Sequence, residues 1–211
     1  MKTILETRPG TYDDYVMTEI ERTYGWMDVK DKVCVDVGAC FGATTAMFAD
    51  KGAKLIVSIE PDEDNFRMLT KNTAGMPVHA IRAAAVQRSY EGESATFYLN
   101  QRKNRGAHSL FVSRGRPSVT VPIVRLQEVL EKFQPEVLKV DCEGSEYPLL
   151  LETLPPCVKQ LTAELHFGKR AWRNELAPAV LEKLKDDGWL TKRSPILTGG
   201  YWFTWGGWQR A

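Results

Sequence analysis

Short apolar runs alternate with helical patterns along most of the chain. Strands are predicted where β-branched and other apolar residues gather, at 33–37, 55–59, 78–86, 95–99, 119–124, 137–140 and 161–165. Helices are predicted from near Tyr12, over 42–51, 62–74, 126–133 and 174–187, and from near Ser145. Strands that alternate with helices are typical of βαβ units, so the sequence predicts an α/β fold with a mainly parallel sheet.

The last part of the chain departs from this alternation. After Gly188, aromatic β-type residues flank Gly199 and Gly200, which predicts a terminal hairpin. No repeat of fixed period and no low-complexity linker interrupts the pattern. The simplest organisation is one domain over 1–211, with a helical N-terminal extension over 1–31 and an insert loop over 100–118.

Composition narrows the class of protein. The 211 residues are 43% hydrophobic and 26% charged with a net charge of +1, which argues against disorder and against capture of nucleic acid by overall charge. A charged N-terminus and the lack of a long apolar run predict no signal peptide, no membrane span and a cytoplasmic location. The four cysteines form no C-x-x-C pair, so reduced and buried thiols are expected.

The ends of the first two predicted strands carry the first candidate chemistry, since ligands of open α/β sheets bind at the carboxyl ends of strands. The first strand runs into Asp36 and a loop from Gly38 to Gly42, and the second ends at Glu60. The loop lacks the G-x-G-x-x-G pattern of dinucleotide sites, and Asp36 would repel a diphosphate but suits an amino group. Glu60 suits ribose hydroxyls. Together these features indicate an adenosine ligand with an amino-acid tail, namely S-adenosylmethionine.

Three segments resemble a known family: VCVDVGACFGATTAMFA, IVSIEPDEDNFRMLTKN and VLKVDCEGSEYPLL. They resemble class I S-adenosylmethionine-dependent methyltransferases and, within these, the FkbM family. Its pattern joins D-V-G-A-x-x-G, E-P-x-x-x-N-F with a later Asn, and K-x-D-x-E-G-x-E. The resemblance implies a Rossmann-like class I methyltransferase fold: a seven-stranded, mostly parallel sheet with helices on both faces and an antiparallel C-terminal hairpin.

The resemblance also implies a cofactor site. Asp36, Gly38 and Gly42 would line the methionine part, Glu60 would bind the ribose, and residues around Ala84 would flank the adenine. The full candidate set for the cofactor is Asp36, Gly38, Ala39, Gly42, Glu60, Ala84 and Asp141. The chain departs from the family pattern at Cys40 and Phe41, which leaves a backbone role for the loop but puts side-chain contacts from position 40 in doubt.

A candidate reaction site follows the strand predicted at 137–140. Asp141, Glu143 and Glu146 bring three carboxylates into six residues. Asp141, at the strand end, is expected to contact the cofactor or the acceptor. Glu143 is expected to point the other way if the strand pleat continues, and Glu146 to complement the dipole of the next helix.

The strand predicted at 161–165 adds Glu164 and His166, which share one face of an extended strand. A hydroxyl acceptor must lose its proton as the methyl group moves, so His166 is a candidate general base, with Asp141 and Glu164 beside it. Two alternatives stay open. His166 is a hydrogen-bonded structural histidine, or Asp141, Glu164 and His166 hold a divalent metal.

The insert from 101 to 116 is basic, with Arg102, Lys103, Arg105, Arg114 and Arg116 and no acid. It is either a solvated loop or a substrate contact through Arg102, Arg105 and His108 that would favour an anionic acceptor. The leading prediction is a methyltransferase that acts on a hydroxyl of a small molecule or carbohydrate. The alternatives are an RNA methyltransferase that uses loop 101–116 and a cofactor-binding protein without catalysis.

Overall fold

A central sheet organises the computed structural model, which describes residues 3–111, 113, 115–166, 171–193 and 203–210, with the backbone alone at 171–175 and 203–205. The sheet contains β1 (Val33–Val37), β2 (Leu55–Ile59), β3 (Val78–Ile81), β7 (Val137–Val140), β8 (Gln160–His166), β9 (Leu190–Arg193) and β10 (Phe203–Gln209). These seven strands have the order β3-β2-β1-β7-β8-β10-β9. The first five in this order are parallel, and β10 is antiparallel to both β8 and β9. The predicted seven-stranded sheet with antiparallel C-terminal strands is confirmed, although the turn predicted at 199–200 lies outside the described residues.

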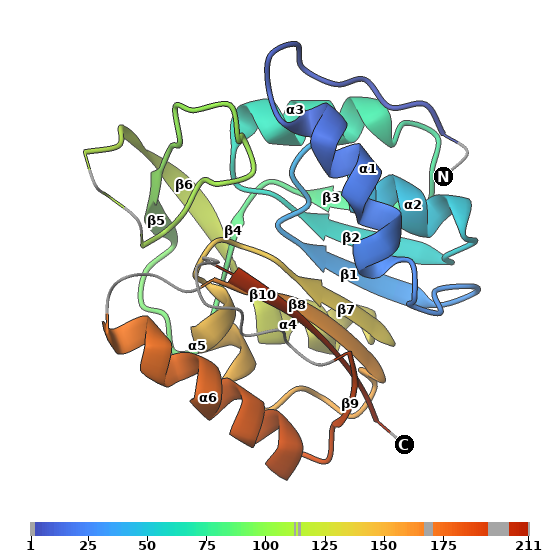
Figure 1. Ribbon diagram of the computed structural model, residues 1–211, viewed down its shortest axis with the longest axis vertical. Coiled ribbons are helices and arrows are strands. Elements are labelled where there is room, and N and C mark those ends of the chain that lie inside the picture. Colours follow the sequence, from blue (N-terminus) through green and yellow to red (C-terminus); the bar gives the residue numbers. More distant parts are fainter. Residues whose placement is uncertain (1–2, 112, 114, 167–170, 194–202, 211) are drawn as a thin grey trace.

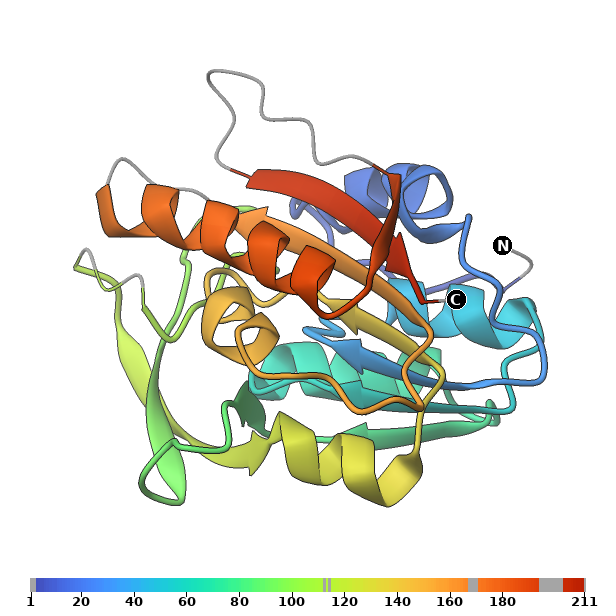
Figure 2. The ribbon, with the colours of Figure 1, turned by 90° about the horizontal axis from the view of Figure 1, so that it is seen from below.

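Helices cover both faces of this sheet (Figures 1 and 2). One face carries α1 (Asp13–Tyr24), α2 (Ala43–Asp50) and α3 (Glu63–Asn72), and the other carries α4 (Leu126–Phe133), α5 (Glu146–Leu150) and α6 (Ala171–Asp186). Successive side chains of a strand point to opposite faces of the sheet. Cys34 packs with Ile20 and Phe48 on the α1–α2 face, whereas Val35 packs with Leu130 on the opposite face. Among the described helices, none combines the length and the apolar character that crossing a bilayer requires.

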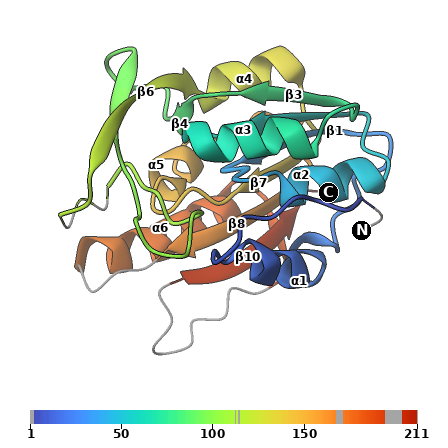
Figure 3. The same ribbon diagram turned by 90° about the horizontal axis from the view of Figure 1, so that it is seen from above.

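A second, smaller sheet projects beside the first (Figure 3). It contains β4 (Ala84–Val86), β5 (Ser94–Tyr98) and β6 (Ser118–Arg125) in the order β4-β6-β5. The single strand predicted over 78–86 is therefore wrong. The chain turns tightly after Ile81, where the amide of Ala83 donates to the Ile81 carbonyl, and β4 leaves the central sheet to pair with β6. The basic insert connects β5 with β6.

A buried polar group lies on the α1–α2 face of the central sheet. The strand register places Asp36 of β1 beside Ser58 of β2 and Lys139 of β7. The Lys139 Nζ lies 3.0 Å from Asp36 Oδ1 and donates to the Gly38 carbonyl at 2.8 Å. Thr45 of α2 donates to Asp36 Oδ2 at 2.7 Å and lies 2.9 Å from the Ser58 hydroxyl. Buried charges are tolerated only when they are paired in this way, so these contacts hold β1, β7 and α2 together.

Lys139→Met should lower the free energy of unfolding by about 3–5 kcal/mol, because it leaves the Asp36 carboxylate buried without its cation. Urea denaturation measures the loss. The double variant Asp36→Asn/Lys139→Met removes both charges at nearly constant volume and should recover part of the stability. A double variant as unstable as the single one would show that the ion pair is not what joins these strands.

Candidate active site

The loop between β1 and α2 packs directly against the ends of the neighbouring strands. Gly38 and Gly42 have φ values of +77° and +93°, and Cys40 has +51°. The amides of Gly38 and Ala39 both donate to the Ile59 carbonyl, at 3.0 and 3.1 Å. A Cβ atom at Gly38 would lie 1.8 Å from the Asp141 carbonyl oxygen, so only glycine allows the loop to meet the end of β7.

Glu60 lies at the end of β2, as predicted, and its carboxylate supports the loop. Oε2 accepts a hydrogen bond from the Cys40 amide at 2.8 Å, and Oε1 accepts from the Asp62 amide at 2.9 Å and from Asn65 Nδ2 at 3.4 Å. Burial raises the pKa of Glu60 to about 7, although hydrogen bonds from the backbone oppose the shift. A carboxylate has about four lone-pair sites, so these three donors leave acceptor capacity for a ligand hydroxyl.

Two asparagines of α3 connect the loop and the neighbouring Glu60 to other segments. Asn65 accepts from Arg8 Nη1 at 2.6 Å and donates to the Arg105 carbonyl at 3.0 Å. Asn72 donates to the Phe41 carbonyl at 2.9 Å and exchanges two hydrogen bonds with the backbone of residue 6. The sequence pattern E-P-x-x-x-N-F with a later Asn marked these positions, but it did not reveal what they bind.

The contacts of Asp36 do not support the cofactor role that its place at the end of β1 suggested. Its side chain is fully buried, and its two oxygens are taken by Lys139 and Thr45. The cation that was expected to come from a cofactor is therefore supplied by Lys139 of the chain itself. Burial alone would lower the pKa of Lys139, but Asp36 and Asp141 outweigh it and raise the pKa. A lysine inside the apolar run at 137–140 was the signal that could have predicted this partner.

Ala84 also differs from its prediction. It lies in β4 of the small sheet and packs against Phe97 and Val121 in a small apolar cluster. Its neighbour Ala85 lines a cavity of about 130 Å³ together with Leu110 and Phe111. The predicted adenine contact at Ala84 is therefore not supported, because the turn after Ile81 carries this residue into the small sheet.

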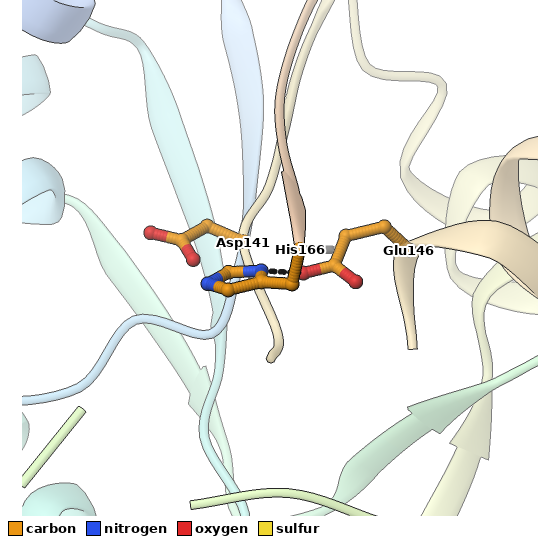
Figure 4. Close-up of side chains that lie close together, drawn as sticks. All are labelled: Asp141, Glu146 and His166. Carbon is orange, nitrogen blue, oxygen red and sulfur yellow. Dashed lines mark hydrogen bonds and ion pairs between the residues drawn. The ribbon is translucent and has the colours of Figure 1, made fainter. Parts of the chain in front are cut away.

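The reaction end is built around His166, the last residue of β8 (Figure 4). Its Nδ1 lies 2.6 Å from Glu146 Oε1, and Asp141 lies on the opposite side of the imidazole ring. Its Nε2 lies 3.4 Å from Glu143 Oε1 and 3.7 Å from Glu164 Oε1. The structure therefore brings Asp141, Glu164 and His166 together, as predicted, and adds two further carboxylates.

The turn after β7 explains why the contacts of Glu143 and Glu146 with His166 were not predicted. Glu143 and Gly144 have φ values of +55° and +108°, so the strand pleat stops and Glu143 turns towards His166. The expectation that Glu143 points the other way is wrong for this reason. Glu146 accepts from the amides of Cys142 and Gly144, at 3.2 and 2.7 Å, so it supports the start of α5 and at the same time binds His166.

The charge state of His166 follows from these neighbours. Burial would lower the pKa of His166, but Glu143 and Glu146 outweigh it and raise the pKa well above its usual value. A raised pKa favours the imidazolium form, which does not support the predicted role of His166 as proton acceptor. Glu143 and Glu164, whose side chains are 25% and 14% exposed, are the proton acceptors that this arrangement offers.

The residues that could hold a metal ion differ from the predicted ligands at one position. Ligand atoms of Asp141, Glu146 and His166 lie within 4.8 Å of one another, so Glu146 replaces Glu164. Two carboxylates and one imidazole suit several divalent ions. Lys139, whose Nζ lies 3.7 Å from Asp141 Oδ2, already supplies positive charge next to these carboxylates. The raised pKa of His166 favours a second positive charge there.

The basic insert is docked against the body of the protein. Arg102, Lys103 and Arg105 are exposed, whereas Arg114 lies outside the described residues. The carbonyl of Lys103 accepts from the Tyr12 amide at 3.0 Å, and Arg116 donates to the Ala107 carbonyl at 2.6 Å. These contacts leave Arg102 and Arg105 available to a substrate but fix the backbone between them.

His108 differs from Arg102 and Arg105 in its burial, although it lines a cavity together with Arg105. It is buried, its Nδ1 accepts from the Asn100 amide at 2.7 Å, and its ring meets the Phe97 ring edge-on. Burial lowers the pKa of His108, with Arg105 and Arg116 adding to the effect against Asp62. These contacts give His108 a structural role, but it also lines a cavity together with Arg105, so its contact with substrate stays a prediction.

A cavity of about 540 Å³ lies between the insert, α3 and the N-terminal segment. Arg8, Arg67 and Arg105 line it together with Asp62 and Asp64. Arg67 is paired with Asp64. The charged side chains that line the cavity are therefore of both signs.

The pKa of His166 is directly measurable by NMR titration of the imidazole. We expect it well above its usual value, and Glu146→Gln should lower it, with Glu63→Gln on α3 as an unaffected control. Because the folded state raises this pKa, its contribution to stability is complete below the unfolded value of about 6.5 and is lost as the pH rises through the folded value. A titration near 6.5 in the wild type would contradict the paired imidazolium.

Comparisons with known proteins agree with this fold. Residues 36–188 match the methyltransferase FkbM domain. Among solved structures, the chain is similar to one provisionally assigned as an S-adenosylmethionine-dependent methyltransferase from Listeria monocytogenes, with a TM-score of 0.56, 10% identity, and coverage of 92% of this chain and 97% of that one. It is also similar to one provisionally assigned as an rRNA methylase from Clostridium thermocellum, with a TM-score of 0.54, 9% identity and 97% coverage of both chains.

A third structure, provisionally assigned as an RNA methyltransferase from Pyrococcus horikoshii, has a TM-score of 0.51, 12% identity, and coverage of 100% of this chain and 93% of that one. At these identities the likeness shows the fold alone. No curated protein matches the chain. The domain match nevertheless spans well over half of the sequence and contains the glycine loop, Glu60 and the cluster around His166. The chain belongs to the FkbM family of S-adenosylmethionine-dependent methyltransferases.

Proposed function

We propose that this methyltransferase acts on a hydroxyl oxygen of a small polar acceptor, with carbohydrates as the leading class. One observation carries the proposal: the partly exposed carboxylates of Glu143 and Glu164 converge on His166 at the carboxyl ends of β7 and β8, beside Asp141. Carboxylates accept hydrogen bonds from hydroxyl groups and can take the proton that a hydroxyl loses. Sugars offer several such hydroxyls without bringing negative charge.

The residues at the strand ends fit the cofactor. Glu60 would accept hydrogen bonds from the ribose, and the backbone of 38–42 would lie along the methionine part. Asp141, rather than Asp36, would receive the α-amino group, because Asp36 is already paired with Lys139. When bound, S-adenosylmethionine supplies an electrophilic methyl group.

The carboxylates around His166 would have different tasks. Glu164 would accept the proton of the attacking hydroxyl, while the protonated His166, held by Glu146, would keep Glu164 and Glu143 in place. Alignment of the acceptor next to the cofactor would account for much of the acceleration. The same carboxylates would repel an acceptor with negative charge near its reacting oxygen.

RNA is the second candidate acceptor, and the exposed Arg102, Lys103 and Arg105 favour it. They lie on the insert, where they could contact phosphates away from the carboxylates. The chain's structural likeness to two proteins assigned to RNA methylation reflects the fold and adds little to this candidate.

A radiolabelled methyl-transfer screen against sugars, small hydroxylated metabolites and RNA tests the function. Transfer to a hydroxyl of an uncharged acceptor is the expected result. Transfer to RNA that is abolished by Arg102→Glu/Arg105→Glu would favour the second candidate. Cofactor binding without transfer to any acceptor class would favour a binding protein without catalysis.

Glu60→Ala should weaken binding of S-adenosylhomocysteine at least tenfold, roughly the value of one hydrogen bond to a charged group. Calorimetry measures the affinity, and thermal unfolding shows whether the loop is still folded. Glu63→Ala, on a carboxylate that is 80% exposed in the next helix, is the matched control. Equal affinity of the Glu60 variant and the control would remove Glu60 from the ribose site.

Glu164→Gln should lower kcat about a hundredfold or more once an acceptor is known, because the amide no longer accepts the proton. The affinity for S-adenosylhomocysteine should stay unchanged. The exposed Glu182 of α6 provides the control variant Glu182→Gln. A Glu164 variant with full turnover would show that another group takes the proton.

A further inference from the structure

Helix α1 precedes residues 36–188, the part of the chain that matches the family domain, yet its last residue reaches the reaction end. Tyr24 is buried against the α1–α2 face of the sheet, and α1 lies beside α2 (Figure 1). The Tyr24 hydroxyl donates to Asp141 Oδ2 at 3.1 Å. The Lys139 Nζ lies 5.7 Å from the centre of the Tyr24 ring.

These contacts leave one side of the Asp141 carboxylate open. Oδ2 receives the Tyr24 hydroxyl and has the Lys139 ammonium at 3.7 Å. Within the described part of the chain, Oδ1 has no hydrogen-bond donor, and the Asp141 side chain is 25% exposed. Asp141 is thus held through Oδ2, lies beside His166 and is still partly open to solvent.

The Tyr24 hydroxyl is a donor that does not titrate in the physiological range. Burial raises the pKa of Tyr24 well above its usual value, and the charges of Asp141 and Glu164 raise it further. A carboxylate without such a donor would sample several side-chain rotamers. A fixed donor keeps one rotamer, which is what recognition of a single charged group requires.

Asp36 offers no comparable acceptor. It is fully buried, and Lys139 and Thr45 take its oxygens. Asp141 lies next to the glycine loop, since a Cβ at Gly38 would meet its carbonyl oxygen. Of these two strand-end aspartates, only Asp141 is placed to meet a ligand amino group beside that loop.

We propose that Tyr24 is a positioning residue that orients Asp141 to bind the α-amino group of the cofactor. The inference rests on the proposed cofactor site and adds α1 to it. Tyr24 acts through Asp141 and does not itself touch the reacting atoms. Its role concerns the amino-acid tail alone, so the adenosine part of the ligand should not sense its loss.

Calorimetry on the full chain with two ligands distinguishes binding of the amino-acid tail from binding of the adenosine part. S-adenosylhomocysteine carries the amino group, and 5′-methylthioadenosine lacks the amino-acid tail. Tyr24→Phe should weaken the first about tenfold, as expected for one hydrogen bond to a charged group, and leave the second unchanged. Tyr15→Phe, on an exposed tyrosine of the same helix, is the control and should change neither affinity.

A double-mutant cycle completes the test. In an Asp141→Asn background, Tyr24→Phe should have no further effect on S-adenosylhomocysteine affinity, because the carboxylate that it positions is gone. Equal losses for both ligands in Tyr24→Phe would reveal a general packing defect and overturn the proposal, as would unchanged affinity for both. A wild-type chain that binds neither ligand would instead overturn the proposed cofactor site itself.

Discussion

The ammonium group of Lys139 is buried between the ends of β1 and β7, and the geometry of both strand ends follows from it. Removing such a charge from water costs several kcal/mol unless a counter-charge and hydrogen-bond acceptors replace the water. Asp36 supplies the counter-charge, and the carbonyls of Val37 and Gly38 supply acceptors at 3.3 and 2.8 Å. The ammonium therefore fixes the direction in which β1 leaves the sheet, and with it the start of the glycine loop.

The same ion pair divides the carboxylates of the strand ends into two kinds. Asp36 is satisfied from within and belongs to the core, whereas Asp141, Glu143 and Glu164 remain partly exposed. His166 lies among these carboxylates, and its contacts with Glu146, Glu143 and Glu164 keep them close in spite of their mutual repulsion. The partly exposed carboxylates of Asp141, Glu143 and Glu164 are therefore available to interact with ligands.

Much of this arrangement could be predicted from the sequence, and the exceptions share a physical cause. Strand ends follow from apolar runs, which is why Glu60, Asp141 and His166 were placed correctly. Backbone turns with positive φ at Glu143 and the tight turn after Ile81 carry no such signal, so the direction of Glu143 and the position of Ala84 were wrong. Ion pairs and hydrogen bonds between residues that are far apart in the sequence also produce no local sequence pattern that would predict them.

Tyr24 shows why such pairings matter for the site. The face of the sheet that carries Lys139 must be covered, and the covering residue must pack against apolar neighbours while meeting charged groups at one end. Tyrosine satisfies both demands, since its ring packs and its hydroxyl donates. At this position the requirement of the core and that of the site are met by one side chain, so α1 is both a covering helix and part of the strand-end site. A sheet end that carries a buried lysine and an exposed carboxylate therefore needs a covering element of this kind.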